Sequence, residues 1–263
     1  MKEVNMAEKP NILSTVPEMD YMEKAPNIDA KEFQKVIDSR RSVRVFDGEP
    51  IPEKVVNRCL ENALLAPNSS NLQPWKFFWV HSDEKKKGIV KACFGQSAAK
   101  TASELFVVVA STGTWKGHAA EMVDLLKKGG PDIPKLAIQY YKKIVPFVYT
   151  LGFLGVLGFL KRFLYFFRGL SAPIIREPVT RGHLRLWAVK STALGAENLM
   201  LSLRAYGYDS CPMEGYDSKR IKKILELPGD SSVVMVVAAG KRVKGGIYGP
   251  RIRFDSGRFI EKV

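Results

Sequence analysis

Apolar residues recur along the chain at two spacings, and the elements they predict alternate between helices and strands. Helical spacing of three or four positions occurs around Phe33 and again over residues 55–64. We expect the first helix to begin after Asp29, an N-capping residue type, and to end near Arg40. The second should start at Pro52, because proline suits the first turn of a helix.

Three short runs of β-branched and aromatic residues predict strands at 76–81, 105–111 and 232–239. The last run is the most continuous, which is typical of a strand buried on both faces. Because these runs alternate with helical patterns, the sequence predicts an α+β domain built on one sheet.

A long helix is expected over residues 183–206. It is apolar on most sides, which places it at the centre of a core or in a subunit interface; these apolar residues include Leu186, Trp187, Leu194, Leu199 and Leu203. Gly207 should end this helix, and Asp217 should cap a shorter one that runs to Leu225.

The chain of 263 residues is long enough for one large core. Residues 1–28 are polar and interrupted by prolines, so we interpret them as a flexible N-terminal arm. Residues 29–263 form a single expected domain, interrupted by an apolar insertion at about 130–180.

That insertion contains seventeen consecutive uncharged residues, 144–160, with basic residues on both sides. A membrane-spanning helix usually needs about 20 apolar residues, and this run also contains Pro146. Three interpretations remain open: a buried or swapped lid, an interfacial membrane-binding hairpin, and a true membrane span. Its flanking cations would suit anionic headgroups in the membrane case; they are Lys142, Lys143, Lys161 and Arg162.

Cysteines and histidines restrict the chemistry. Cys59, Cys93 and Cys211 are scattered, which argues against a disulfide framework and for a reducing compartment. The three histidines are also far apart, so we expect no zinc or iron site. The N-terminus has no apolar signal core, and we expect a cytoplasmic protein, with membrane association as an alternative.

Two arginine-rich segments suggest anion binding on a chain whose net charge is +14. Residues 40–44 read RRSVR, and residues 250–253 read PRIR. Guanidinium and hydroxyl groups hold phosphate by charge-assisted hydrogen bonds, although a solvated basic turn and a basic tail have the same composition. The candidate ligands are Arg40, Arg41, Ser42, Arg44, Arg251 and Arg253.

Two further motifs carry polar or backbone groups. Residues 67–75, PNSSNLQPW, form a polar loop whose amides could pair with the imide edge of a flavin, or simply form turns. Residues 211–217, CPMEGYD, lead into the helix capped by Asp217, and Gly215 allows a close backbone approach to a planar ligand. An ordinary helix entry would look the same.

In order and spacing, these four motifs together resemble the nitroreductase family over roughly residues 30–255. The resemblance implies a central, mostly antiparallel sheet flanked by helices, an intertwined homodimer, and FMN at the subunit interface. It implies that Arg40, Ser42, Arg251 and Arg253 hold the phosphate and that Arg44 lies near N1 and O2 of the ring. Ring contacts would come from Asn68, Ser69 and Asn71 of the partner subunit, and from the segment Pro212, Met213, Glu214 and Gly215.

The function implied is electron transfer from NADH or NADPH to small aromatic acceptors such as nitroaromatics or quinones, with ping-pong kinetics. FMN performs the hydride chemistry, so we assign no catalytic acid or base. A reductive dehalogenase or a flavin-consuming enzyme is the alternative within flavin chemistry. A non-catalytic basic protein that binds membranes or nucleic acid is the alternative outside it, but such a protein has no use for the polar motifs, so we expect no nucleic-acid partner.

Overall fold

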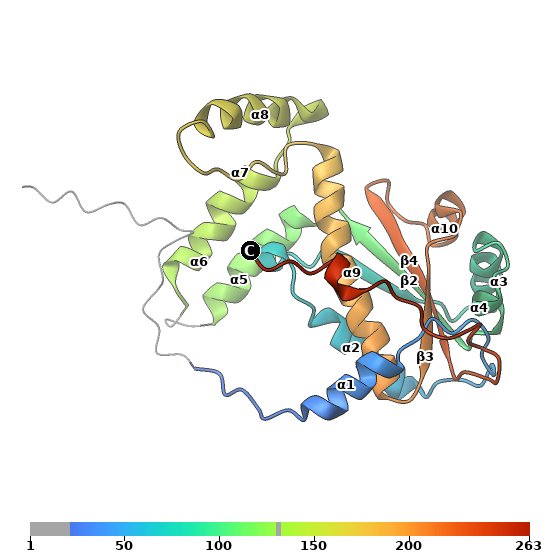
Figure 1. The fold of residues 1–263 in the computed structure, drawn as a ribbon. Helices are drawn as coiled ribbons and strands as arrows, with labels where there is room; N and C mark the ends of the chain where they lie inside the picture. The colour runs from blue at the N-terminus through green and yellow to red at the C-terminus, as the bar shows by residue number, and fades with distance from the viewer. Residues whose placement is uncertain (1–21, 130–132) are drawn as a thin grey trace, which may run out of the picture.

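The computed structural model describes residues 22–129 and 133–263 (Figure 1). Most of the expected N-terminal arm, residues 1–21, lies outside the described residues. Residues 22–29 have no regular secondary structure and lead into α1 (Ala30–Ser39). The fold is therefore described from the end of the predicted arm onwards.

Four strands form one fully antiparallel sheet with the order β1-β2-β4-β3. They are β1 (Trp75–Trp79), β2 (Glu104–Ser111), β3 (Asp209–Met213) and β4 (Ser231–Gly240). The runs predicted as strands are β1, β2 and β4, with boundaries shifted by no more than two residues. The predicted α+β class and its antiparallel sheet are confirmed.

The strand β3 was not predicted, because residues 211–217 were interpreted only as the segment that leads into the helix capped by Asp217. Pro212 lies opposite Val237 of β4, at the edge of the sheet. An edge strand tolerates proline because only one side of the strand must supply ladder hydrogen bonds. Pro212 therefore disfavours a strand in the sequence pattern, whereas pairing with β4 stabilises the strand in the structure.

Alternating side chains of β2 divide the core between two layers of helices. Phe106 and Val108 contact the cluster formed with α2 (Glu53–Leu64) and α9 (Arg181–Ala205). Val107 and Val109 point to the opposite face, where α3 (Asp83–Ala92), α4 (Ser97–Thr101) and α10 (Ser218–Ile224) pack. The helix layers on the two faces of the sheet are visible in Figure 1.

Capping side chains fix the helix boundaries as predicted. The Asp29 side chain accepts a hydrogen bond from Lys31 N at 2.8 Å, and Asp217 caps α10 in the same way. Beyond the end of α9, Gly207 has a φ of +85°, which favours glycine. The long helix itself begins two residues before the predicted start, at Arg181.

The insertion folds as a chain of short helices at one end of the molecule (Figure 1). After α5 (Trp115–Lys128), α6 (Lys135–Gln139) continues through a π-helical turn (Tyr140–Ile144) into α7 (Val145–Tyr149). A short turn then redirects the chain into α8 (Val156–Arg168).

None of the helices in the described residues is, by itself, both apolar and long enough to cross a membrane. The segments Lys135–Tyr149 and Phe153–Arg168 satisfy that requirement only as a pair bent by 68°. Within the pair the two halves differ, because Val145 and Tyr149 of α7 are buried whereas the apolar side chains of α8 are exposed. The expectation of a lid buried on its own subunit is therefore wrong for α8.

Candidate functional site

The two arginine-rich segments meet in space, as the phosphate-site prediction requires. Residues 40–44 and 247–253 line one cavity of about 230 Å³. The first segment is held against the sheet edge by a bridge between Ser42 and Ser210 of β3. Of the eleven residues that line the cavity, five are arginines and none is acidic, so its potential is strongly positive.

Two of these arginines also tie the segments together. Arg41 donates from Nη2 to the Gly249 carbonyl at 2.7 Å. Arg251 donates from Nη2 to the carbonyl oxygens of Asp38 and Arg40, at 2.8 and 2.6 Å. Some N–H groups of the arginines predicted to bind phosphate thus hold the C-terminal segment beside the end of α1 instead.

The Arg44 side chain lies between this cavity and β3. Its guanidinium lies 5.7 Å from the centre of the Tyr248 ring. Its charge lowers the pKa of the buried Cys211 thiol, although burial raises that pKa by more. Arg44 is therefore close to the strand that leads into the predicted ring-binding segment.

The residues of the segment 212–215 differ in how far their side chains are buried. The Met213 side chain is buried in the core, so its backbone is the part that faces outward at the sheet edge. Glu214 and Gly215 are exposed after the end of β3. The Gly215 carbonyl accepts a hydrogen bond of 2.7 Å from Gln96 Nε2, which fixes the backbone at this turn.

The polar loop is held in an unusual backbone conformation. Ser70, Asn71 and Gln73 have φ values of +58°, +46° and +45°, which side chains other than glycine rarely adopt. The Asn68 Oδ1 atom accepts a hydrogen bond of 2.7 Å from Gln73 N across the loop. Such strain persists only where surrounding contacts maintain it.

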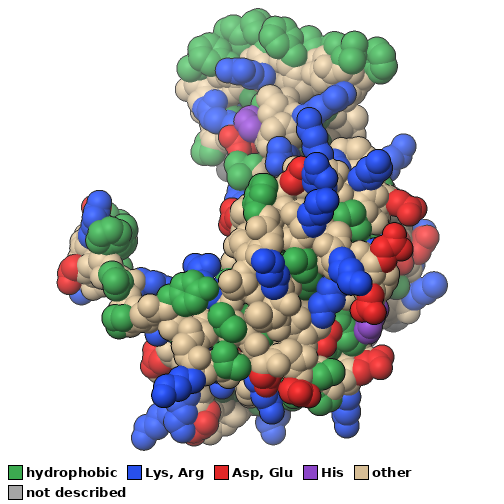
Figure 2. Space-filling model, turned by 90° about the vertical axis from the view of Figure 1, so that its right-hand side faces the viewer, with side chains coloured by type: hydrophobic (Ala, Val, Ile, Leu, Met, Phe, Trp, Pro, Cys, Tyr) green, Lys and Arg blue, Asp and Glu red, His purple; other side chains and the backbone are tan. Residues whose placement is uncertain are grey.

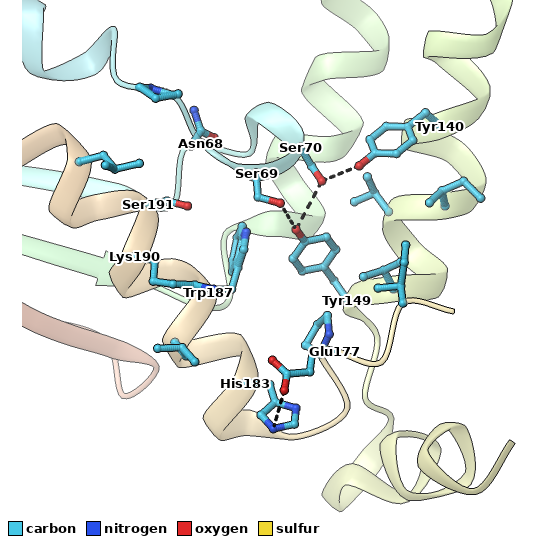
Figure 3. Close-up of a pocket in the computed structure, with 18 residues that line it drawn as sticks. Asn68, Ser69, Ser70, Tyr140, Tyr149, Glu177, His183, Trp187, Lys190 and Ser191 are labelled. Carbon is cyan, nitrogen blue, oxygen red and sulfur yellow. Dashed lines mark hydrogen bonds and ion pairs between the residues drawn. The ribbon is translucent and has the colours of Figure 1, made fainter. Parts of the chain in front are cut away.

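Three tyrosines from the insertion provide these contacts, two of them through their hydroxyls to the serines of the loop (Figure 3). The hydroxyls of Ser70 and Tyr140 are 2.7 Å apart, and those of Ser69 and Tyr149 are 3.4 Å apart. Tyr141 also donates to the Ser70 carbonyl at 2.9 Å. The insertion therefore fixes the shape of the predicted ring-binding loop, a coupling between two segments that the sequence does not indicate.

This loop opens onto a second, larger cavity of about 530 Å³, which Figure 3 shows from within. One side is formed by α7 and the opposite side by α9. The lining is largely apolar and aromatic, and it includes Ile144, Val148, Tyr149, Trp187 and Leu194.

Several polar groups in this cavity were not predicted from the sequence. His183 Nδ1 accepts from Val179 N at 3.3 Å, which leaves the ring proton on Nε2, 3.7 Å from Glu177 Oε1. Burial raises the pKa of the Tyr149 phenol, so it stays protonated and able to donate. The only signal in the sequence was that His183 begins the long helix, which does not reveal a cavity.

The predicted site residues thus do not meet in one cavity within one chain, and Asn71 and residues 212–215 line neither of the two cavities. The arginines line the smaller cavity, whereas Asn68 and Ser69 line the larger one. The resemblance implied that loop and arginines belong to one site through a partner subunit, and this separation within one chain agrees with that arrangement. The dimer itself stays a prediction.

Comparison with known proteins gives a consistent result. A protein of Thermus thermophilus named NADH dehydrogenase is 28% identical over 231 residues, covering 88% of this chain and 95% of its own. The Bacillus subtilis protein MhqN, provisionally named as an NAD(P)H nitroreductase, is 27% identical over 211 residues, covering 80% and 88%. A provisional nitroreductase from Exiguobacterium sibiricum, solved in complex with FMN, shares the fold with a TM-score of 0.66 and 24% identity, covering 92% of this chain and 100% of its own.

The family model for the nitroreductase family matches residues 37–241. This range includes the first arginine segment, the polar loop, the long helix and the segment at the edge of the sheet, and it ends shortly before the second arginine segment. The sheet, the paired arginine segments and the matched range lead to one conclusion: the chain belongs to the nitroreductase family.

Proposed function

We propose that this chain binds FMN and uses NADH or NADPH to reduce small aromatic or quinone-like acceptors. The observation that carries the proposal is the cavity formed by residues 40–44 and 247–253, where five arginines converge. The names of the two relatives refer to NADH and to NAD(P)H, and the related fold from Exiguobacterium sibiricum contains FMN. These names support the same cofactor and donors here.

The residues present fit the phosphate end of FMN. A phosphate dianion needs several donors and a positive field, and the cavity offers both. Arg253 donates to the adjacent Ile252 carbonyl, and Ser42 also belongs to the cavity lining. We assign Arg40, Ser42, Arg251 and Arg253 as phosphate ligands, with Arg41 holding the cavity closed through Gly249.

The ring of FMN would extend from this cavity toward the end of β3. Arg44, beside Cys211, is placed to favour negative charge near N1 and O2 of the ring. The backbone from Met213 to Gly215 is held at the sheet edge by Gln96 and would contact the ring near N5 and O4. When bound, FMN accepts a hydride from the nicotinamide and passes electrons to the acceptor.

The acceptor site is assigned to the larger cavity, completed in a homodimer. Its loop supplies Asn68, Ser69 and Asn71 to the ring held by the partner's arginines, while α7 and α9 supply an apolar wall. Donor and acceptor would occupy this space in turn, which gives ping-pong kinetics. The apolar lining favours quinones and hydrophobic aromatics over polar acceptors.

The test begins with the purified protein. FMN should copurify, be released without a covalent link and be identified by mass spectrometry. Anaerobic reduction by NADH and by NADPH, followed by a screen of quinones and nitroaromatics, then gives the donor and acceptor classes. Release of FAD, or failure to bind any flavin on reconstitution, would contradict the proposal.

A further inference from the structure

The helix α8 has its polar and apolar faces reversed relative to an ordinary surface helix. The stripe turned toward the protein contains Gly158, Lys161 and Tyr165, spaced three and four residues apart. The side chains turned outward are apolar and are between 40% and 85% exposed, counting the turn before the helix. They are Phe153, Leu154, Val156, Leu157, Phe159, Leu160, Phe163, Leu164, Phe166 and Phe167.

Specific contacts hold α8 in this orientation. Lys161 is only 3% exposed, and its ammonium donates to the carbonyl oxygens of Phe147 and Thr150 at the end of α7, the latter at 2.6 Å. Gly158 lies so close to the Val179 carbonyl that a Cβ atom there would collide with it. The lysine therefore caps α7 from inside the protein, and rotation of α8 would break this cap.

The charged residues of this segment of the sequence are all basic, up to Glu177. Residues 133–176 contain no aspartate or glutamate. By helical spacing, Arg162 and Arg168 lie on either side of the inward stripe, where it borders the apolar face. The basic residues of this region are Lys135, Lys142, Lys143, Lys161, Arg162, Arg168 and Arg176.

Figure 2 shows the result as a continuous hydrophobic crest along the top of the molecule, over α8, with Lys and Arg side chains beneath it. The crest has a convex outline in this view, and α8 projects beyond the body of the fold (Figure 1). An exposed apolar surface of this continuity marks an interaction site.

We propose that α8 docks on a lipid bilayer that carries anionic headgroups, lying in the plane of the interface with its phenylalanines among the acyl chains. An apolar face bordered by arginines is the arrangement of interfacial helices, whose apolar side enters the membrane by about 5–10 Å.

A bilayer suits this surface better than a second copy of the chain. The crest is convex, whereas a stable contact between copies would need a complementary apolar surface. Each copy also carries a net charge of +14, so a neighbouring copy offers little to attract the arginines at the border. Anionic headgroups supply that attraction, worth about 1 kcal/mol for each basic residue near the surface.

Flotation of the full-length, cofactor-loaded protein with vesicles tests the proposal. It should float with vesicles of phosphatidylcholine plus phosphatidylglycerol, and less with phosphatidylcholine alone or at high salt. Each of Phe159→Ser and Phe163→Ser should weaken partitioning by roughly tenfold, because each removes an aromatic side chain that the bilayer would bury. The control is Phe94→Ser, which changes a phenylalanine that is 74% exposed outside the insertion and should float as the parent does.

Two results would overturn the proposal. The parent protein could remain at the bottom of the gradient with both kinds of vesicle. Alternatively, Phe159→Ser and Phe163→Ser could convert a larger oligomer to a smaller one in sedimentation without lipid, while flotation is unchanged, which would make α8 a contact between copies. Because flotation does not depend on turnover, it is separate from the test of the proposed function.

Discussion

Arg251 donates a hydrogen bond of 2.6 Å to the carbonyl oxygen of Arg40, 211 positions earlier in the chain. The contact gives the C-terminal segment a fixed place beside the end of α1. Arg253, two residues further on, donates only to the neighbouring Ile252 carbonyl within the described residues. Both arginines line the cavity, but Arg251 also joins the two segments, whereas Arg253 makes only a local contact.

The first prediction follows from this difference. Arg253→Ala should weaken FMN binding by about 1.5–3 kcal/mol, because it removes one charge-assisted contact to the phosphate. The melting temperature of the cofactor-free protein should not change. Arg258→Ala is the control, because Arg258 lies over the Phe254 and Phe259 rings and does not line the cavity.

Fluorescence titration with FMN at two salt concentrations measures the effect. Arg251→Ala should lower both the affinity and the melting temperature, since it also removes the contacts to Asp38 and Arg40. Equal FMN affinities for the parent and Arg253→Ala would exclude Arg253 as a phosphate ligand.

Local signals were sufficient to predict part of the fold. Asp29 and Asp217 cap helices as expected, because an N-cap depends on residues two or three positions away. The edge strand β3 was missed because Pro212 disfavours a strand locally, and only pairing with Val237 supplies the ladder. Elements that depend on distant partners were the ones the sequence could not predict.

The second prediction concerns Asp209, a buried carboxylate at the start of β3. It accepts from Arg204 at 2.8 Å and from Arg242 at 2.7 Å, so it joins the end of α9 to the segment after β4. Asp209→Ala leaves two guanidiniums without their partner and should reduce the free energy of unfolding by about 3 kcal/mol.

Urea denaturation measures this loss. The matched control is Asp124→Ala, since Asp124 pairs with Lys127 on the exposed face of α5 and contributes little in water. A similar small change for both variants would show that the buried cluster is not a stabilising contact.

The third prediction is a pH dependence caused by two buried thiols. Burial raises the pKa of Cys59 and of Cys93 from 9.0 to about 11. Between these values the folded protein holds protons that the unfolded chain releases, so the free energy of unfolding should fall as pH rises from 9.0 to about 11.

Denaturation curves across this range, for the parent and for a Cys59→Ala, Cys93→Ala protein, give the thiol contribution by difference. The double variant should be less stable throughout but should lose stability less steeply with pH. Parallel slopes would mean that other groups cause the dependence.

The fourth prediction is that the chain is a homodimer whose interface includes α9. Leu186 and Leu194 are each 49% exposed in the single chain although they lie on its central helix, and Phe33 on α1 is also uncovered. We expect a partner subunit to bury these side chains, and the proposed cofactor site also requires a partner subunit.

Leu194→Asp should give a monomer in sedimentation at low micromolar concentration and should lose FMN. Phe94→Asp, an exposed position outside α9, should remain dimeric and loaded. A flavin-loaded monomer of the parent protein would refute the predicted interface.

The insertion shows where periodicity stops being informative. The spacing of apolar residues in 156–168 identifies a helix with an apolar face, but it does not say toward which side that face turns. The orientation is decided by Lys161 and Gly158, through contacts with the end of α7 and with Val179. A lysine within an apolar run would ordinarily be assigned to the solvent side.

The last prediction separates the two halves of the insertion by function. Ile144 and Val148 at α7 line the large cavity, whereas Phe163 of α8 does not. Val148→Ser should therefore lower kcat/KM for an apolar quinone on the order of tenfold relative to a polar nitroaromatic, because it removes apolar contact inside the pocket. Phe163→Ser should leave this ratio unchanged in vesicle-free solution. A short-chain, water-soluble quinone is the appropriate substrate, since it reaches the cavity without a membrane. If Phe163→Ser shifted the ratio as much as Val148→Ser does, α8 would belong to the acceptor site, and its exposed phenylalanines would be explained by substrate binding instead.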